Sequence, residues 1–549
     1  MMPAKAQPQA QAQAQAHGRT GPLRRLAAMP QGRIILLSGL LIGLVLALPG
    51  QTVTTKYVND LFIFLEGAYR IQTGQVPNVD FRSSLGPIAY YIPALGLALG
   101  GSLGAAMPLG MALTTLGFAL IASHVIATRM RPALGLPLAL YLLLIVAVPM
   151  NPGEGIADLS FAMFYNRIGW AALGLLLVMY LPPLRPRRGQ GAADAACAAL
   201  LTLLMLYLKI SYGLVCIAFL IFMLTDRRQW GWAASALALT AAAGLGIEAV
   251  WGGTAGYLAD LRLASEVSGD FPGPRALVTE LQRNLPEICI YAIFAALLLW
   301  ARRSLRDVLF LVCCLVTGIL LIEQNFQIVG ILTLGAGAAV AAEASLRASH
   351  PLQRGVPLLL LAFLAPPVVH FSVVLGLHGG LGLARQGVPL SLPNYHGIRL
   401  VRLWNEGQYP AFRRYDDSLR DGAAVLARLD APGRVLVLDF VGPFTAGLGL
   451  APTQGGSTWH HWGRTVDARH HMPPDDFLAD ARIVMEPKAP IERWTTNGLR
   501  EVYAAALAER FVLAAETEFW RLHVARDARL DLSPLGSMTT TMQSRTAQP

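Results

Sequence analysis

The chain has few charged residues for its length. Asp, Glu, Lys and Arg make up only 14% of its 549 residues, whereas hydrophobic residues make up 54%. Such a composition excludes an ordinary water-soluble enzyme. Apolar runs of roughly the 20 residues that cross a bilayer recur along the chain, and lipid offers no partners to free backbone groups. The sequence therefore predicts an α-helical polytopic membrane protein.

Several motifs are missing, and each absence excludes a class of protein. All five cysteines lie inside apolar runs, so neither a disulfide framework nor a zinc-finger spacing is present. There is no Walker-type phosphate loop and no G-x-S-x-G elbow, which argues against an ATP-driven pump and a serine hydrolase. The net charge of +10 forms no basic face interleaved with aromatic residues, so no nucleic-acid partner is expected.

About eleven membrane spans are expected, and the arginines orient them. The spans lie near residues 34–50, 107–127, 133–150, 168–184, 194–208, 211–225, 231–251, 286–301, 308–322, 328–344 and 356–377. Arginines cluster in alternate turns, and the positive-inside rule places these turns and the N-terminus in the cytoplasm. The loops 51–106 and 151–167 then face outward. We expect a multi-pass protein of the bacterial inner membrane.

Two segments of the first outer loop are predicted to be helical. Residues 86–105 are apolar enough to cross, but a crossing there would place every later arginine turn outside, so an interfacial or re-entrant helix is expected. Residues 56–74 carry one apolar stripe, and Gly74 ends it. We expect this amphipathic helix to lie on the membrane surface and to hold Asp60 near the lipid headgroups.

Composition divides the chain into four parts. Residues 1–32 and 531–549 are predicted to be disordered tails, the first of them cytoplasmic. Residues 33–378 form the membrane domain. Charged residues, His, Trp and Pro return after it, and residues 379–530 predict a soluble α/β domain on the outer side. Its expected elements are a helix at 416–429, a strand at 434–440, a strand at 482–485, a helix at 497–509 and strands at 511–515 and 520–524.

The outer loops carry the candidate acids. Asp60 begins the amphipathic helix, and Asp80 lies in an extended stretch framed by Pro and Gly. Glu154 and Asp158 are four residues apart in the second outer loop and share a side if that stretch is helical. A carboxylate in such a place can act as a general base toward a hydroxyl. The alternative is that these acids serve only solubility.

Cations and amides close to the same face could complete a cavity. Lys209 interrupts an apolar stretch where two spans meet, and Arg167 begins a span on the outer face. Either could hold a phosphate, although Lys209 could simply mark a tight turn and Arg167 could be an interface anchor. The other candidates for lining the cavity are Asn166, Arg82, Gln324 and Asn325. His460, His461, His470 and His471 match no known zinc pattern and are interpreted as surface or substrate-contact groups.

Taken together, these motifs resemble the GT-C superfamily of membrane glycosyltransferases, in the branch of aminoarabinose transferases and protein O-mannosyltransferases. The resemblance covers about residues 34–345. It is carried by Asn59-Asp60, Ala68-Tyr69-Arg70 and Gly74, by Val79-Asp80-Phe81 leading to Gly86-Pro87 and Tyr90, by the acidic loop 151–167 and by Lys209. The family commonly has a second acid where this chain has Asn59, and a Lys-Gly where this chain has Lys209-Ile210.

The resemblance implies a GT-C-like bundle and a polyprenyl-phosphate-linked sugar donor. Lys209 or Arg167 would hold the donor phosphate, and Asp60, Asp80 or Asp158 would act on the hydroxyl of a glycan, lipid or protein acceptor. The reaction would be an inverting displacement. Members of the family differ in their need for a divalent cation, and a few carboxylates could hold Mg²⁺ or Mn²⁺. The rival functions are a lipid-glycan flippase or transporter and a glycan polymerase or ligase.

Overall fold

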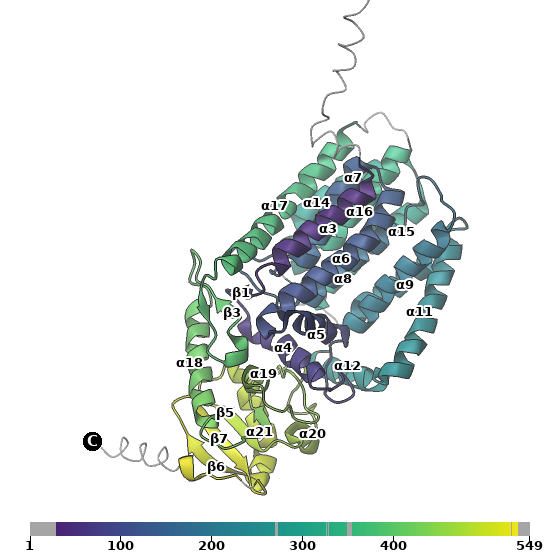
Figure 1. Cartoon of the computed structure of the whole chain (residues 1–549). Helices are drawn as coiled ribbons and strands as arrows, with labels where there is room; N and C mark the ends of the chain where they lie inside the picture. The colour runs from purple at the N-terminus through teal and green to yellow at the C-terminus, as the bar shows by residue number, and fades with distance from the viewer. Residues whose placement is uncertain are drawn as a thin grey trace, which may run out of the picture.

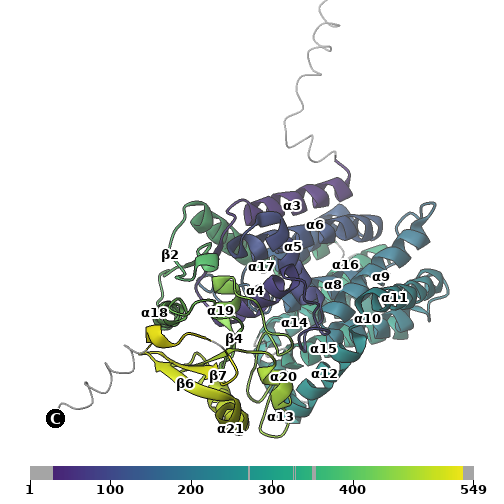
Figure 2. The ribbon, with the colours of Figure 1, turned by 60° about the horizontal axis from the view of Figure 1, so that its bottom comes forward.

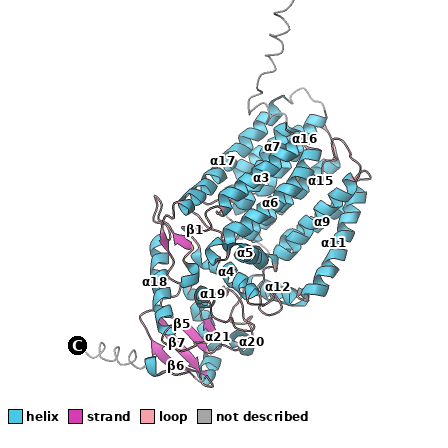
Figure 3. Cartoon of the chain, in the orientation of Figure 1, coloured by secondary structure: helices cyan, strands magenta, loops and turns pink. Residues whose placement is uncertain are grey.

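The structure is a computed structural model, and it describes residues 29–269, 273–324, 327, 329–348, 354–528 and 530–535. Most of the two predicted tails, and the candidate Asn325, lie outside the described residues. A bundle of long helices forms one part of the molecule, and a smaller domain that contains a four-stranded sheet lies at one end of the bundle (Figures 1 and 3).

A helix lies at each of the eleven expected spans. These helices are α3 (Gln31–Ala47), α6 (Leu103–Arg129), α7 (Pro132–Ala147), α8 (Phe164–Val178), α9 (Gln190–Leu208), α10 (Ile210–Met223), α11 (Trp230–Trp251), α14 (Leu285–Ala301), α15 (Leu305–Gln324), α16 (Leu332–Arg347) and α17 (Val356–Leu383). Within the described residues, α6, α9, α11, α15 and α17 are long and apolar enough to cross a membrane unaided. A sixth span results if α14 is joined to α13 (Pro274–Arg283), from which it is bent by 77°. The protein is thus a multi-pass membrane protein, and eleven crossings stay a prediction.

The arginine-rich turns meet at one end of the bundle. Arg129, at the end of α6, donates from Nη2 to Asp194 Oδ2 of α9 at 2.6 Å. Arg347, at the end of α16, donates to the backbone carbonyl of Arg129. Arg306 of α15 reaches Asp226 Oδ2 in the turn after α10 at 2.5 Å. The turns that the positive-inside rule assigns to the cytoplasm therefore share one face of the molecule.

The helix α5 (Ile88–Gly100) is too short to span. Its 13 residues rise about 20 Å at 1.5 Å each, against a hydrocarbon thickness of about 30 Å. The chain reverses at Gly101, whose φ of +65° favours glycine, and Ser102 then caps α6 by accepting from the amide of Ala105. α5 and α6 pack so closely that a side chain at Gly96 would meet the carbonyl of Ala106 at 1.9 Å. This hairpin supports the prediction of an interfacial or re-entrant helix.

The helix α4 (Val58–Gln72) corrects one expectation. The sequence predicts a helix with one face open to the membrane surface, but both its apolar and its polar faces are buried. Figures 1 and 2 show α4 between the bundle and the smaller domain. Phe62 stacks on Tyr395 of that domain with ring centroids 4.7 Å apart. The side chains that the stripe pattern assigned to solvent are instead used for contact between domains.

The smaller domain is α/β, as expected, and its elements match the predicted order. They are β2 (Val388–Pro389), β3 (Ile398–Leu400), α18 (Tyr409–Leu426), β4 (Val435–Val437), α19 (Pro443–Leu448), α20 (Pro474–Leu478), β5 (Ile483–Pro487), α21 (Arg493–Arg510), β6 (Phe511–Glu516) and β7 (Trp520–Ala525). Four strands form a sheet of order β4-β5-β7-β6, in which only the β4–β5 pair is parallel. A second small sheet joins β1 (Thr52–Thr54), just after the first helix, to β3 in parallel and β3 to β2.

A buried ion pair joins α4 to this domain. Arg70 Nε lies 3.0 Å from Glu66 Oε1, and both side chains are nearly inaccessible. The Arg70 guanidinium also donates to the carbonyls of Thr453 and Gly455, while Glu66 Oε2 accepts from the amide of Ala446 in α19. Because each charge is paired and also hydrogen-bonded, the network fixes α4 against the domain at low desolvation cost.

Candidate active site

Asp60 lies in the first turn of α4, where the bundle meets the smaller domain. The side chain is enclosed by protein but is not sealed from water, and Asn59 Nδ2 donates to its Oδ1 at 3.3 Å. Burial raises the pKa of the Asp60 carboxyl to about 7; the charge of nearby Arg464 opposes the rise and that of Glu492 adds to it. Near neutral pH this carboxyl exists in both protonation states, as a general base requires.

Lys209 occupies the one-residue break between α9 and α10. Its backbone is extended, and its Nζ reaches Asn166 Oδ1 at 3.4 Å and lies 5.3 Å from the ring centre of Tyr165. Burial lowers the pKa of Lys209 to about 7, and repulsion from Arg464 adds to this effect. A buried cation at a helix break, with an amide and an aromatic ring beside it, is a candidate for binding an anion.

The segment Gly86-Pro87 supports this break. The amide of Gly86 donates to the carbonyl of Leu208, the last residue of α9, at 3.1 Å. A side chain at Gly86 would lie 2.0 Å from the carbonyl oxygen of Tyr207, so only glycine allows this close approach. Gly86, a residue of the first outer loop, thus supplies a hydrogen-bond donor to the last carbonyl of α9, next to Lys209.

Arg464 of the smaller domain completes the cluster, and sequence reasoning missed it. It lies in a tight turn in which the amides of Arg464 and Thr465 both donate to the carbonyl of His461. Its charge acts on Asp60, Tyr165 and Lys209, and its own pKa is lowered, chiefly by burial. The only signal in the sequence was its place inside the His- and Trp-rich segment 459–471. Asp60, Tyr165, Asn166, Lys209 and Arg464 are called the Asp60 cluster below.

The cluster places two basic groups beside one acid. Lys209 and Arg464 are enclosed and repel each other, and the pKa values of Asp60 and Lys209 both lie at about 7. Glu492, just before α21, adds a further carboxylate whose pKa is raised by burial. An anion with two negative charges would relieve the repulsion between the cations, which is the electrostatic profile of a phosphate site.

Two residues with left-handed backbones precede the helices of the cluster. Tyr57 has φ +55° before α4, and Met163 has φ +49° before α8, which carries Tyr165 and Asn166. Neither is glycine, and such conformations persist only where the surroundings impose them. Tyr57 is held by its amide, which donates to Gln408 Oε1 at 3.1 Å, and by its hydroxyl, which donates to Glu154 Oε1 at 3.1 Å.

The other candidate acids lie in local structures of their own loops. Asp80 Oδ2 accepts from the amide of Val76 at 2.7 Å, and Asp158 Oδ2 accepts from the amide of Gly155 at 3.0 Å. Glu154 pairs with Lys56 at 2.5 Å and so ties the second outer loop to the first. Among the described residues, no hydrogen bond or ion pair joins Asp80, Asp158 or Glu154 to Asp60.

Arg167 is fully buried near the cluster but faces the protein backbone. Its Nη1 donates to the carbonyls of Met150 and Ala162 at 3.1 and 3.3 Å, which holds the second outer loop against α8. In the described part of the chain, its Nε and Nη2 have no hydrogen-bond partner. A phosphate role for Arg167 stays a prediction.

Arg82 and Gln324 have other surroundings, and of the four histidines His461 shares a turn with Arg464. Arg82 pairs with Asp476 of α20 at 2.7 Å, and Gln324 ends α15 and is exposed. The four histidines sit in separate settings: His460 packs on Phe477, His461 on Phe440, His471 on Tyr503, and His470 lies 3.2 Å from Asp467. No group of three or more His, Cys, Asp or Glu able to hold a metal ion occurs among the described residues.

The fold is similar to that of ArnT. The solved structure of ArnT from Cupriavidus metallidurans in the apo state matches with a TM-score of 0.44 and 13% identity, over 89% of this chain and 97% of that one. The structure of ArnT from the same organism bound to undecaprenyl phosphate matches with a TM-score of 0.42 and 14% identity, over the same shares. No family model and no curated protein matches the sequence.

Proposed function

We propose that the protein transfers a sugar from a polyprenyl-phosphate-linked donor to an acceptor hydroxyl at the outer face of the inner membrane. The observation that carries the proposal is the Asp60 cluster, in which a base of suitable pKa lies with two enclosed cations at the end of a membrane-helix bundle. This end is opposite the arginine-rich turns. A donor that arrives through the membrane suits such a site, because nucleotide sugars stay in the cytoplasm.

In the proposed reaction, Asp60 takes the proton of the acceptor hydroxyl. The acceptor oxygen forms a bond to the anomeric carbon, and the bond between that carbon and the phosphate oxygen breaks, leaving its electron pair on the phosphate. Polyprenyl phosphate departs, with its charge held by Lys209 and Arg464. A single displacement of this kind inverts the configuration at the anomeric carbon.

The pairing of Lys209 and Arg464 supports this division of roles. Both are enclosed, Arg464 acts on both Lys209 and Asp60, and the repulsion between the two cations is relieved by a dianion. Arg167 has already committed one nitrogen to two backbone carbonyls, so Lys209 is the better candidate for the phosphate. Asp60 is likewise preferred as base over Asp80 and Asp158, whose carboxylates close turns in their own loops.

The test uses the purified full-length protein with a panel of polyprenyl-phosphate sugars. We expect consumption of at least one donor with release of polyprenyl phosphate, and a loss of about 100-fold or more in Asp60→Asn, the range that general-base catalysis contributes. Asp480→Asn, the same exchange at a surface ion pair with Arg434, should keep full activity. EDTA in the same assay tests for a divalent cation. No consumption of any donor would refute the proposal and favour a flippase. Full activity of Asp60→Asn would refute the role of Asp60 as the base.

A further inference from the structure

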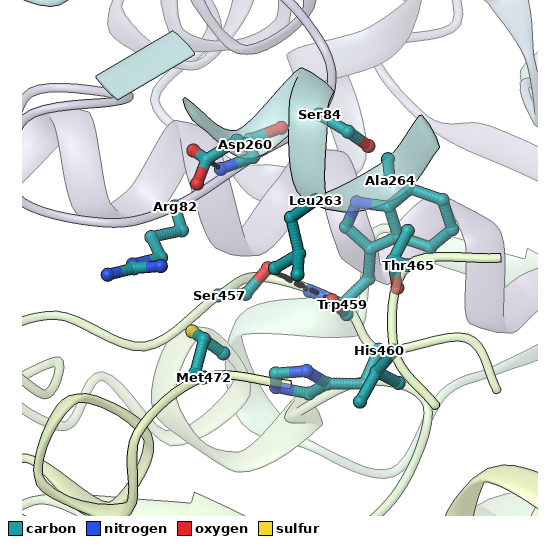
Figure 4. Close-up of a pocket in the computed structure, with 12 residues that line it drawn as sticks. Arg82, Ser84, Asp260, Leu263, Ala264, Ser457, Trp459, His460, Thr465 and Met472 are labelled. Atoms are coloured by element: carbon teal, nitrogen blue, oxygen red, sulfur yellow. Dashed lines mark hydrogen bonds between the residues drawn. The ribbon is translucent and has the colours of Figure 1, made fainter. Parts of the chain in front are cut away.

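A groove lies between the two domains, next to the Asp60 cluster. One wall comes from α12 (Thr254–Ser268) and the first outer loop, with Asp260, Leu263 and Ser84; the other comes from the smaller domain, with Trp459, His460 and Thr465. Figure 4 shows these two sets of side chains facing each other. The groove has a volume of about 40 Å³, room for about three or four water molecules at about 10–15 Å³ each, and it opens to solvent on one side.

Asp260 presents one unused carboxylate oxygen to this groove. Its Oδ2 accepts from the amide of Ser83 at 2.8 Å and from Asn78 Nδ2 at 3.4 Å. Its Oδ1 has no hydrogen-bond partner within the described residues, although the residue is only 7% exposed. Burial raises the pKa of Asp260 to about 6, so the group is an ionised acceptor at neutral pH. Because Oδ1 is not sealed off from the groove, it is available to accept a hydrogen bond from a ligand.

The other groove residues supply complementary donors. Ser84 Oγ, Trp459 Nε1 and the ring nitrogens of His460 likewise have no hydrogen-bond partner among the described residues, and none of these atoms is sealed off. The pKa of His460 is lowered to about 4, chiefly by burial, so its ring is neutral and can donate one hydrogen bond and accept another. The Trp459 ring is held by edge contacts with Phe440 and His461.

The charge of the groove excludes a phosphate as its ligand. Its one cation, Arg82, is paired with Asp476, and the remaining ionised group is the carboxylate of Asp260. The groove therefore does not suit an anion, and it offers hydrogen-bonding groups and an indole face to a ligand that has hydroxyl groups and an apolar side. A sugar ring has these properties, because its hydroxyls lie at the edge and its C–H bonds form a face.

We infer that this groove binds a neutral sugar ring of the acceptor, with Asp260 and Ser84 on its hydroxyls and Trp459 against its apolar face. That the sugar belongs to the acceptor rests on the proposed function. That the groove binds a sugar rests only on the geometry of the groove. One turn links the two places: it supplies Arg464 to the Asp60 cluster and Thr465 to the groove. A sugar in the groove therefore lies beside the residues that would receive its neighbouring hydroxyl.

The binding test needs no donor, so its result is independent of the transfer assay. The full-length protein is kept in a detergent without sugar groups, such as lauryldimethylamine oxide. Methyl β-glucopyranoside, methyl β-galactopyranoside and methyl α-mannopyranoside are added singly at millimolar concentration, and saturation-transfer NMR detects binding. We expect saturation transfer to the ring protons of at least one glycoside. The transfer signal should fall fivefold or more in Asp260→Asn and in Trp459→Ala.

Two further variants keep the test decisive. Ser84→Trp fills the groove from the other wall without removing any contact of Trp459, and it should abolish the signal even if Trp459→Ala fails to fold. Asp480→Asn is the matched control and should bind like the original protein. Absence of saturation transfer to all three glycosides would overturn the inference that the groove binds a sugar. So would saturation transfer in Asp260→Asn and in Ser84→Trp as strong as in the original protein. Donor consumption that fails while glycosides still bind would instead overturn the proposed function alone.

Discussion

At the scale of single residues, the proposed chemistry depends on two groups whose pKa values are brought together by burial. Asp60 normally titrates near 4 and Lys209 above 10, yet enclosure moves both to about 7. A base that is free to accept a proton and a cation that is still charged coexist only in a narrow pH range. The pH dependence of the enzyme should report this overlap.

We expect a bell-shaped profile of kcat/KM for the donor, with its maximum near pH 7. Below that pH Asp60 is protonated and cannot act as a base, and above it Lys209 loses the charge that attracts phosphate. Lys209→Arg should lose the alkaline fall, because a guanidinium stays charged. Lys488→Arg, at a Lys paired with Glu516 at 3.1 Å, is the matched control and should keep the bell. An alkaline limb that persists in Lys209→Arg would assign that limb to another group.

The raised pKa of Asp60 also predicts a stability change. The folded protein holds a proton at pH 5–7 that the unfolded chain releases, so the stability linked to this proton is lost as the pH rises through about 7. Asp60→Asn cannot ionise, and its advantage over the original protein should grow by on the order of 1 kcal/mol per pH unit between pH 5 and 7. Thermal unfolding in detergent at pH 5 and pH 8 measures this. If the difference in stability between Asp60→Asn and the original protein is the same at pH 5 and at pH 8, the raised pKa of Asp60 is contradicted.

At the scale of elements, α4 is the piece that joins the domains. It carries Asp60 at one end and the Glu66–Arg70 pair nearer the other, and the pair grips the loop 452–456 and α19 of the smaller domain. Loosening the pair should therefore disturb both the stability of the molecule and the position of Asp60, the proposed base.

Arg70→Met should cost about 3–5 kcal/mol, because it leaves Glu66 buried without a counter-charge. The matched control is Arg262→Met, which removes the partner of Glu266 at the same i,i+4 spacing and a similar distance of 2.9 Å. That pair is on the surface, with Arg262 81% exposed, and should contribute less than about 1 kcal/mol. Chemical or thermal unfolding of the two variants compares them. Equal losses would mean that the Arg70 network does not hold the domains together.

At the scale of the whole molecule, the arginine-rich turns and the smaller domain occupy opposite ends of the bundle. Arg188, in the turn before α9, and Gln454, in the smaller domain, are both exposed. In a Cys289→Ser background, Gln454→Cys should react with a membrane-impermeant maleimide in intact bacterial spheroplasts. Arg188→Cys should react only after permeabilisation. Labelling in the reverse order would invert the predicted orientation.

Much of this architecture could be read from sequence periodicity. The strand predicted at 482–485 is β5 (Ile483–Pro487), and the helix predicted at 497–509 is α21 (Arg493–Arg510), because alternation and helical spacing are local properties. The break at Lys209 between two apolar runs is also local. The prediction for α4 was wrong in one respect, since Glu66 and Arg70 look solvated in the sequence but have partners some 380 residues away along the chain.

The site could be predicted only in part, for the same reason. Asp60 and Lys209 interrupt patterns, one at the start of an amphipathic helix and one within an apolar stretch, and so attract notice. Arg464 and Asp260 interrupt nothing: the first lies in an irregular polar loop and the second in a helix of mixed composition. Only the folded chain brings Arg464 to Asp60, and Asp260 to Ser83.

The pairing of β1 with β3 has a consequence for biosynthesis. Thr52, in the strand that precedes α4, lies opposite Ile398, which follows the last long helix, and its amide donates to the carbonyl of Gly397 at 3.0 Å. At about 5–20 residues per second, a ribosome needs on the order of 20–70 s to deliver the second strand after the first has emerged. Throughout that interval the segment that carries Asp60 lacks the smaller domain that packs against it. A prematurely terminated polypeptide could insert its helices but would expose an unfinished edge, which marks it for proteolysis before it can consume any donor.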